Sequence, residues 1–276
     1  MILYKYVPPE RIDILQNKCI RFTPINEFND PFEFSLNMTI EKKSMVDFLM
    51  KKYLKSIKKA VFTYNPNLIH FEHQINWREK VFEIYKNDTF YTFVNWKKIF
   101  INIRDDISQK IAILSLSETR DNLLMWGHYT NNHTGIVIGF DTDNFISNPL
   151  VDLPKKVNYK DEKVNIHLTH IENISLNKNI RKDTNLAILT KSTHWKYEKE
   201  WRCLIDLKSI NSLSEIKGLV TINPKAIKEI ILGVNVDVKL QNLVLNLKKN
   251  HPEYKNINIY KASMNLTKYL LDIEKV

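Results

Sequence analysis

The sequence predicts an α+β fold with a mixed, mostly antiparallel central sheet and a helical insert. Three observations support this prediction. Short apolar, strand-like segments occur towards both ends of the chain, a stretch with helical periodicity separates them at about 41–109, and the 276 residues are enough to bury a full core. We therefore expect a single domain over residues 1–276 that carries the insert.

The first segments indicate a strand, a short helix and a second strand. Ile2–Tyr6 and Cys19–Phe22 are strand-like, and Glu10–Asn17 follows two prolines, which are favoured where a helix begins. Thr23–Phe34 then combines two prolines with three phenylalanines. Because aromatic side chains tend to be buried and the residue before a proline avoids the helical conformation, we expect an ordered loop here.

The helical insert is predicted from apolar residues that recur at every third or fourth position. The pattern runs through 45–61, Ile75–Tyr85 and Phe93–Ile107. Trp77 and Trp96 belong to it. Large aromatic residues are usually buried, so we expect these two to pack inside the insert and not to stack on nucleic-acid bases.

The second half of the chain returns to strand-like segments. A helix is expected over Leu176–Thr190, and another over Asp237–Lys249, whose aspartate and two lysines lie at the ends that the helix dipole favours. The strands are expected at Ile111–Ser117, Thr134–Phe140, Leu150–Tyr159, Glu200–Ile205, Gly218–Ile222, Ile227–Gly233 and Ile257–Tyr260.

The composition limits the classes of protein that fit. No uninterrupted apolar run of about 18 residues occurs, and the N-terminus lacks the pattern of a secretory signal, so we expect a cytoplasmic protein with no membrane partner. Cys19 and Cys203 lack CxxC spacing, so we expect reduced thiols and no metal site built on them.

The charge is basic, with 41 Lys and Arg against 31 Asp and Glu, which gives +10. Such a balance attracts polyanions, so a nucleic acid is a candidate partner. Most of the excess is lysine in short runs, which also fits a merely solvated basic surface. Both interpretations remain open at this point.

The stretch Ser115–Asp141 holds three of the five glycines and two of the eight histidines. Because the chain contains few glycines, their concentration in this stretch indicates tight turns or close approach of the backbone to other atoms. His128 and His133 are five positions apart and do not share a helix face, so they are not expected to bind one metal without a further ligand. For His128 a structural role and a catalytic role are both open.

A second polar cluster occupies Lys191–Arg202. On a strand, Glu198, Glu200 and Arg202 would point to one face and Trp201 to the other. Two carboxylates on one face repel each other unless basic groups or a ligand compensate them, which favours a functional role for Glu200.

A third polar cluster contains Asn29, Asp30 and Glu33. Asp30 precedes a proline, so it is either a turn former or a site residue.

These motifs together resemble those of the bacterial domain of unknown function 2971. The resemblance extends from about residue 2 to about residue 235 and is weakest in the insert. It is carried by Leu3–Tyr6, Arg21–Phe22, Phe28–Glu33, Leu123–Tyr129 with His133 and Gly135, and Trp195–Arg202.

The chain is also similar, in fewer residues, to the ADP-ribosyltransferase superfamily. Those enzymes begin with a strand that bears a residue gripping NAD, and they end with a glutamate on a later strand that handles the nicotinamide ribose. Here Tyr4 and Lys5 would take the first position and Glu200 the last. The superfamily usually has His or Arg where this chain has Tyr4 or Lys5. The resemblance implies an ADP-ribosyltransferase-like sheet and NAD as the substrate.

The resemblance implies cleavage of the nicotinamide–ribose bond, which passes through an oxocarbenium-like state that a carboxylate stabilises. Glu200 is the candidate for that carboxylate, with His128 as a base or hydroxyl-orienting group and either Tyr129 or Trp126 as a residue that stacks on the nicotinamide or adenine ring. The chain has neither GxGxxG nor GxxxxGK[ST], so no Rossmann or P-loop site is expected. The further candidates for contacts with NAD are Tyr4, Lys5, Arg21, Asn29, Asp30, Trp126, Lys191 and Arg202.

Three functions remain open. The first is an ADP-ribosyltransferase or NAD glycohydrolase that acts in toxicity or phage defence, with nucleic acid as a candidate acceptor. The second is a nucleic-acid binder or nuclease whose acidic residues hold a divalent metal. The third is a nucleotide sensor with an operon-encoded regulatory partner. The first requires His128 and Tyr129 to face Glu200 and Arg202 across a cleft, with Asn29–Glu33 at its rim.

Overall fold

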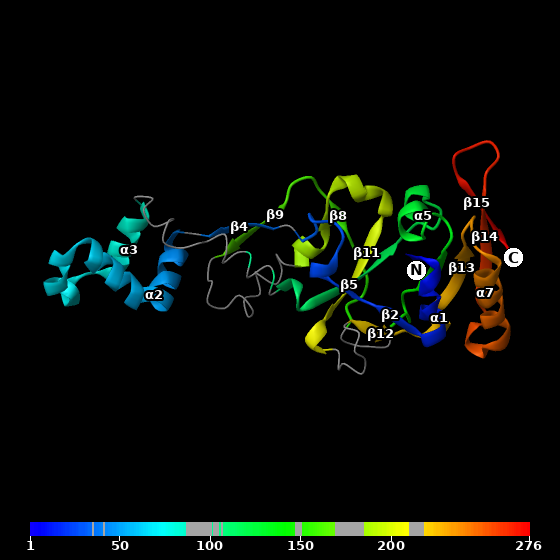
Figure 1. Ribbon diagram of the computed structural model, residues 1–276, viewed down its shortest axis with the longest axis horizontal. Coiled ribbons are helices and arrows are strands. Elements are labelled where there is room, and N and C mark those ends of the chain that lie inside the picture. Colours follow the sequence, from blue (N-terminus) through cyan, green and yellow to red (C-terminus); the bar gives the residue numbers. More distant parts are fainter. Residues whose placement is uncertain are drawn as a thin grey trace. The chain divides into compact units, whose positions relative to one another are not determined.

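The computed structural model describes residues 1–34, 36–40, 42–86, 101, 105, 107–146, 151–168, 185–209 and 218–276 (Figure 1). The chain divides into two compact units. The first unit comprises Met1–Glu33, Ile107–Asp161 and Leu189–Val276, and it contains all residues of the candidate site described below. The second comprises Phe34–Asp106 and Glu162–Ile188.

A nine-stranded sheet forms the centre of the first unit, in the order β15-β14-β13-β6-β1-β5-β11-β7, with β3 also pairing with β5. Only β13 and β14 run parallel, so the predicted mixed, mostly antiparallel sheet is confirmed. The strands are β1 (Ile2–Val7), β3 (Thr23–Pro24), β5 (Ile111–Ser117), β6 (Ile136–Asp141), β7 (Lys155–Lys156), β11 (Glu200–Asp206), β13 (Ile227–Leu232), β14 (Asn258–Met264) and β15 (Leu271–Lys275).

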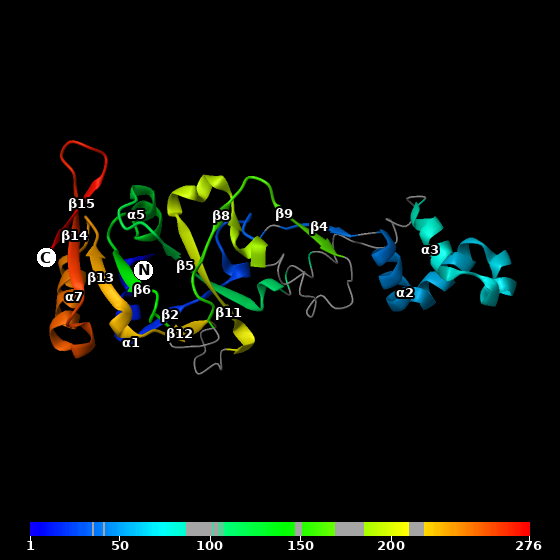
Figure 2. The same ribbon diagram turned by 180° about the vertical axis from the view of Figure 1, so that it is seen from behind.

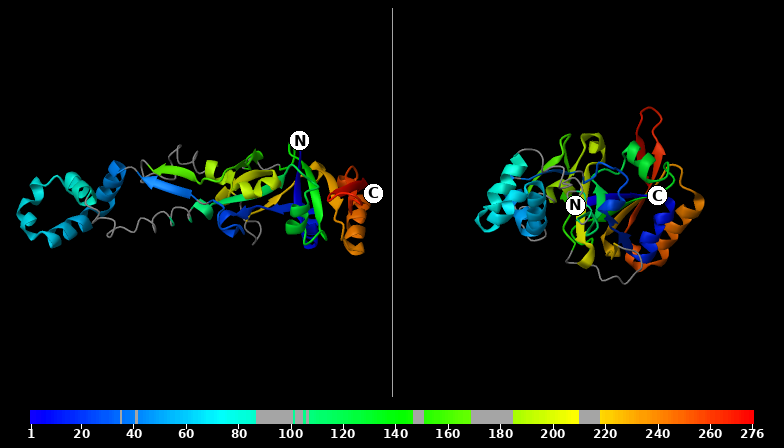
Figure 3. Two further views of the ribbon diagram at one scale, coloured as in Figure 1. Left: turned by 90° about the horizontal axis from the view of Figure 1, so that it is seen from above. Right: turned by 60° about the vertical axis from the view of Figure 1, so that its left-hand side comes forward.

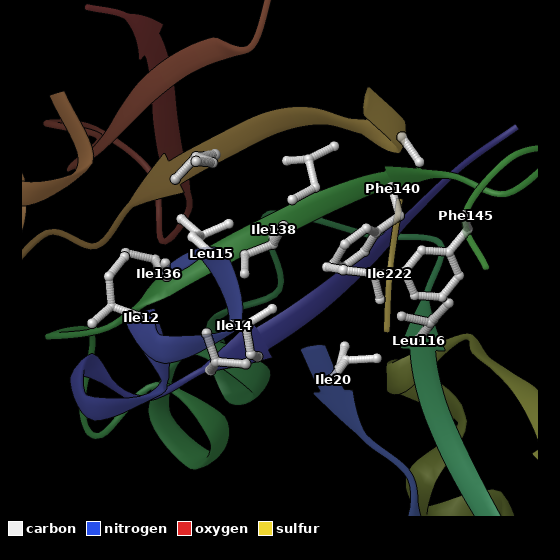
Figure 4. Packing of buried hydrophobic residues seen from close by; sticks show 14 of the residues in the cluster. Ile12, Ile14, Leu15, Ile20, Leu116, Ile136, Ile138, Phe140, Phe145 and Ile222 are labelled. Carbon is white, nitrogen blue, oxygen red and sulfur yellow. The ribbon is translucent and has the colours of Figure 1, made fainter. Parts of the chain in front are cut away.

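The main hydrophobic core lies on one face of this sheet, where α1 (Asp13–Asn17) and α7 (Val238–Asn250) pack. Alternation along β6 directs Ile136 and Ile138 to this face, where Figure 4 shows them beside Leu15. The N-cap of α7 is Asp237, whose side chain accepts a hydrogen bond of 2.6 Å from the Leu240 amide. The helix therefore begins where the sequence predicts.

The other face of the sheet carries α5 (Leu123–Tyr129). Val137 of β6 points to this side and packs in one cluster with Met125 and Trp126 of the helix. The helix begins after Asn122, whose side chain accepts a hydrogen bond of 3.1 Å from the Met125 amide. The candidate site lies on this second face, beside α5.

The first unit also contains two short strand pairs. β2 (Cys19–Arg21) pairs with β12 (Leu219–Thr221), and β8 (Asn158–Tyr159) pairs with β10 (Thr190–Lys191). The strand expected at Leu150–Tyr159 is thus divided between β7 and β8. Thr190, expected at the end of a helix, lies in β10; of that helix, 185–188 is helical and 176–184 lies outside the described residues.

The C-terminal hairpin of β14 and β15 extends past the end of the sheet (Figure 2). No helix in the described part of the chain is long and apolar enough to cross a membrane. Cys19 and Cys203 are free, and burial raises the pKa of the Cys203 thiol to about 12, so this thiol stays protonated.

The second unit contains the expected helices, α2 (Lys42–Tyr64) and α3 (Trp77–Lys86), joined by the 3₁₀ segment Pro66–Gln74 (Figure 3). Trp77 is buried and meets the Phe62 ring edge-on, with 5.4 Å between ring centroids, so it packs inside the unit as expected.

The second unit also holds β4 (Leu36–Ile40) and β9 (Val164–Leu168), which pair in parallel and lie beyond the limits predicted for the insert. The rest of the predicted insert, at 87–100, 102–104 and 106, lies outside the described residues and includes Trp96.

Gly127 and Gly135, both in the stretch Ser115–Asp141, differ in how much room the structure leaves for a side chain. Gly127 lies in α5 with no atom within 4 Å of the position where a Cβ would stand, whereas a Cβ on Gly135 would lie 2.1 Å from the Val7 carbonyl oxygen. We expect Gly127→Ala to raise the free energy of unfolding by about 0.5–1 kcal/mol, since glycine weakens a helix. Denaturant unfolding measures the change. Gly135→Ala, the matched variant, should lower the free energy of unfolding. An increase would contradict the conclusion that Gly135 has no room for a side chain.

Candidate functional site

The central sheet opens between β1 and β5. β1 pairs with β6 along its whole length, but it pairs with β5 only at Tyr4 and Ser117. Beyond that pair, the Lys5 Nζ donates a hydrogen bond of 3.0 Å to the Ser115 carbonyl. The Lys5 side chain thus bonds to a backbone carbonyl that would accept a backbone hydrogen bond if the two strands were paired here.

A pocket of about 140 Å³ is lined by residues on both sides of this opening. Its walls combine apolar or aromatic side chains with charged ones. The aromatic lining residues are Tyr4, Tyr6, Phe28 and Tyr129. The charged lining residues are Lys5, Glu33, Lys191, Glu198 and Glu200.

Three carboxylates beside the pocket share two cations. The Lys191 Nζ lies 3.3 Å from Glu33, 2.7 Å from Glu198 and 3.1 Å from Glu200. The Arg202 guanidinium donates hydrogen bonds of 2.8 Å to a carboxylate oxygen of Glu33 and 2.8 Å to one of Glu200. None of the five side chains is more than 9% exposed, so their charges are shielded from water and interact strongly with one another.

A tight bend places Glu198 and Glu200 beside the same ammonium group. Glu198 ends the 3₁₀ segment Thr193–Glu198, and Lys199 turns the chain with a left-handed φ of 44° before β11 begins at Glu200. The expectation that both glutamates lie on the strand was therefore wrong for Glu198. Trp201 packs against the main core, on the opposite face from Glu200, as expected.

The cluster keeps Glu200 ionised. Burial alone would raise its pKa, but Arg202 and Lys191 outweigh burial and hold the pKa at about 2. Burial likewise opposes the charge of Lys191, whose pKa is nevertheless raised by Glu200, Glu198 and Glu33. Glu200 therefore suits a role as a fixed negative charge and does not suit a role as a proton donor at neutral pH.

Tyr129 contacts the cluster directly. Its hydroxyl donates a hydrogen bond of 2.5 Å to Glu198, and its pKa is raised by burial and by that carboxylate, so the phenol stays protonated. On the other side, the Glu200 amide donates a hydrogen bond of 2.8 Å to the Tyr159 hydroxyl. Burial raises the pKa of Tyr159 to about 12.

The pocket brings together many of the residues proposed from the sequence. Tyr129 and Glu200 face one pocket, and Asn29 and Glu33 belong to the same lining, whereas His128, which the first hypothesis also requires there, does not. Arg202 is 1% exposed and holds two of the carboxylates from within the fold. The other proposed residues in the lining are Tyr4, Lys5 and Lys191.

Besides Arg202, four residues proposed from the sequence are absent from the described lining of the pocket. Trp126 is fully buried, its Nε1 donates a hydrogen bond of 2.9 Å to the Arg120 carbonyl, and its ring stacks on His133 at 6.0 Å between centroids. His128 is exposed, and its ring lies edge-on beside that of Tyr129. Trp126 is thus a core residue, which corrects its assignment as a ligand-stacking ring.

The remaining two of these residues also have other contacts. The Arg21 guanidinium donates a hydrogen bond to Glu27, and the Asp30 carboxylate accepts one of 2.8 Å from the Phe32 amide. Asp30 is therefore the turn former that its position before a proline allows. Arg21 is thus paired with Glu27, and its contact with NAD stays a prediction.

Two aromatic residues of the lining, Tyr6 and Phe28, were not among the binding residues proposed from the sequence. Tyr6 could have been found, because it alternates with Tyr4 along β1 and therefore shares its face. The sequence placed Glu33 only at the rim of the cleft, because its partner Arg202 lies 169 positions further along the chain.

A shared metal does not fit the carboxylate cluster. Among the residues that the structure describes, no three His, Cys, Asp or Glu side chains are arranged to hold a metal ion. The Lys191 ammonium already occupies the position between Glu33, Glu198 and Glu200 at which a divalent cation would bind.

The comparison with protein families concerns the segment that contains α5 and the carboxylate bend. Residues 125–203 match the family model described as protein of unknown function (DUF2971). The predicted resemblance to DUF2971 is confirmed. The match begins in α5 at Met125 and ends in β11 at Cys203, so it includes Tyr129, Lys191, Glu198 and Glu200. No curated protein and no solved structure shows significant similarity to the chain.

Proposed function

We propose that the pocket binds the nicotinamide–ribose end of NAD and cleaves the bond between them, so that the protein acts as an NAD glycohydrolase or ADP-ribosyltransferase. One observation carries the proposal: Lys5 on the first strand, Tyr129 on α5 and Glu200 on β11 line one pocket. β1 and β11 are the strands to which the superfamily resemblance assigns the residue that grips NAD and the glutamate. Through the opening of the sheet between β1 and β5, the nicotinamide ring would reach both Lys5 and Glu200.

The charge state of Glu200 suits this reaction. As the C–N bond to C1 of the ribose breaks, nicotinamide leaves as a neutral molecule and the ribose becomes an oxocarbenium-like cation. A carboxylate with a pKa of about 2 is anionic throughout and stabilises that cation. Water, or a hydroxyl of an acceptor, then adds to C1 and loses a proton.

The pocket is sized for one end of NAD. Its volume of about 140 Å³ is well below the roughly 300–1,000 Å³ of pockets that enclose a whole drug-sized ligand. The Tyr4, Tyr6 and Phe28 rings offer aromatic surfaces to a cationic pyridinium ring. The pyrophosphate and adenine would then lie outside the pocket. Because Lys191 and Arg202 are already bound to carboxylates, their predicted contact with the pyrophosphate would require this cluster to rearrange.

The proposal also includes an ADP-ribosyltransferase-like fold and a role in toxicity or phage defence under an operon-encoded partner. The net charge of +10 supports a nucleic acid as the acceptor of ADP-ribose. The alternative of a metal-dependent nuclease is disfavoured by the position of Lys191 among the carboxylates.

Incubation with NAD and chromatographic measurement of free nicotinamide test the proposal. We expect nicotinamide to be released in proportion to time and protein concentration, with or without added single-stranded DNA or RNA. If no nicotinamide forms under any of these conditions, the proposal is rejected. NAD binding without release would then indicate the sensor, and magnesium-dependent cutting of the DNA or RNA would indicate the nuclease.

A further inference from the structure

Lys5 is a half-buried lysine whose amine lines the pocket without a carboxylate partner. Its Nζ donates one hydrogen bond, of 3.0 Å, to the Ser115 carbonyl. Within the described ranges it forms no ion pair, whereas Lys191, the other lysine of the same lining, is bound to three carboxylates. The two lysines of one pocket therefore have opposite surroundings.

These surroundings make Lys5 easier to deprotonate than an ordinary lysine. Burial lowers the pKa of its ammonium group to about 8, against the weaker attraction of Glu200 and Glu198. A lysine that is desolvated in this way carries a lone pair in a useful fraction of molecules near neutral pH, and that lone pair is the nucleophile of amine catalysis. Lys191, with its pKa raised, keeps its proton.

We propose that Lys5 forms a Schiff base with a small hydroxyaldehyde bound in this pocket. The Nζ lone pair attacks the carbonyl carbon, a C–N bond forms, and the carbonyl oxygen takes up a proton to give a carbinolamine. The hydroxyl then takes up a second proton and leaves as water, the nitrogen loses its two protons in the course of these steps, and a C=N bond remains. One amine and one aldehyde thus give one imine and one water, with no oxidant or reductant.

The pocket contains groups that suit each part of such a ligand. The Tyr129 hydroxyl and the Glu198 carboxylate form a hydrogen-bonded pair in the lining, which offers hydrogen-bonding groups to the carbinolamine hydroxyl. Asn29, in the same lining, offers a hydrogen-bond donor and an acceptor to a hydroxyl group. The volume of about 140 Å³ limits the ligand to a few carbon atoms. The inference depends on this pocket and not on NAD cleavage.

Reductive trapping tests the inference on the full chain. The protein is incubated at neutral pH with limiting glycolaldehyde and cyanoborohydride, which reduces an imine to a stable secondary amine, and the adducts are located by peptide mass spectrometry. We expect Lys5 to be trapped about 10-fold or more faster than exposed lysines such as Lys239, because its pKa lies below their usual range. Fragment ions must separate Lys5 adducts from adducts on the α-amino group of Met1.

The pH profile and a conservative variant complete the test. Trapping at Lys5 should level off above about pH 8, while trapping at exposed lysines continues to rise with pH. Lys5→Arg keeps the charge and should remove the fast adduct without moving it to Lys191. Equal labelling of Lys5 and Lys239 in the wild-type protein, or fast labelling of Lys191, would overturn the inference. Neither result would bear on the release of nicotinamide.

Discussion

Replacing Glu200 with glutamine is expected to lower the rate of nicotinamide release from NAD by about 10³-fold, because the amide cannot offer a negative charge to the oxocarbenium-like state. The substitution keeps the shape of the side chain. Single-turnover kinetics with saturating NAD measure the chemical step directly. The loss should therefore appear in the rate constant, with NAD affinity changed much less.

The control for this experiment is Glu118→Gln. Glu118 is a half-buried carboxylate that accepts hydrogen bonds from Lys156 and from the Trp201 indole, outside the described lining of the pocket. Its variant should keep the wild-type rate. If Glu200→Gln is folded by circular dichroism and releases nicotinamide within a few-fold of the wild-type rate, Glu200 is not the stabilising carboxylate.

Replacing Arg202 with methionine is expected to lower the free energy of unfolding by about 3–5 kcal/mol, because it leaves buried carboxylates without their cation. Arg202 is 1% exposed and binds both Glu33 and Glu200. Urea unfolding followed by tryptophan fluorescence measures the loss. The effect should be largest at neutral pH, where Glu200 is ionised.

The matched control is Arg11→Met, since Arg11 forms a half-exposed pair with Asp13 at 3.0 Å. Exposed pairs contribute roughly 0–1 kcal/mol, so this variant should be nearly as stable as the wild type. The pH dependence gives a second check. Because the pKa of Glu200 is lowered to about 2 in the folded protein, its stabilising contribution is present above about pH 4.5 and is lost as the pH falls towards 2. Arg202→Met should flatten that part of the curve, and equal losses in the two variants would contradict the role of the buried cluster.

The elements with a strong local signal were predictable from the sequence. β5 is a continuous apolar run with the predicted bounds Ile111–Ser117, and α7 has an aspartate cap and terminal lysines that mark both of its ends. Strands of two residues carry no such periodicity. The pairing of β8 with β10 is therefore set by the tertiary structure alone.

The site was partly predictable for the same reason. Glu200 and Arg202 share a face by strand alternation, which the sequence reveals. The position of Glu198 depends on a left-handed backbone at Lys199, which an ordinary lysine does not signal. Trp126 was proposed as a contact for NAD because its ring could stack on the ligand, but the helix turns that ring inward against His133. The residue type alone therefore did not predict whether the side chain points into the pocket or into the core.

The position of β1 has a consequence for the order of folding. β1 lies in the middle of the sheet, where Leu3 pairs with Phe140 and Tyr4 pairs with Ser117. Both partners are far along the chain, so more than a hundred residues must follow β1 before its ladders can close. Until then the apolar residues of β1 lack their partners in the sheet, and this is the interval in which such a topology is open to aggregation.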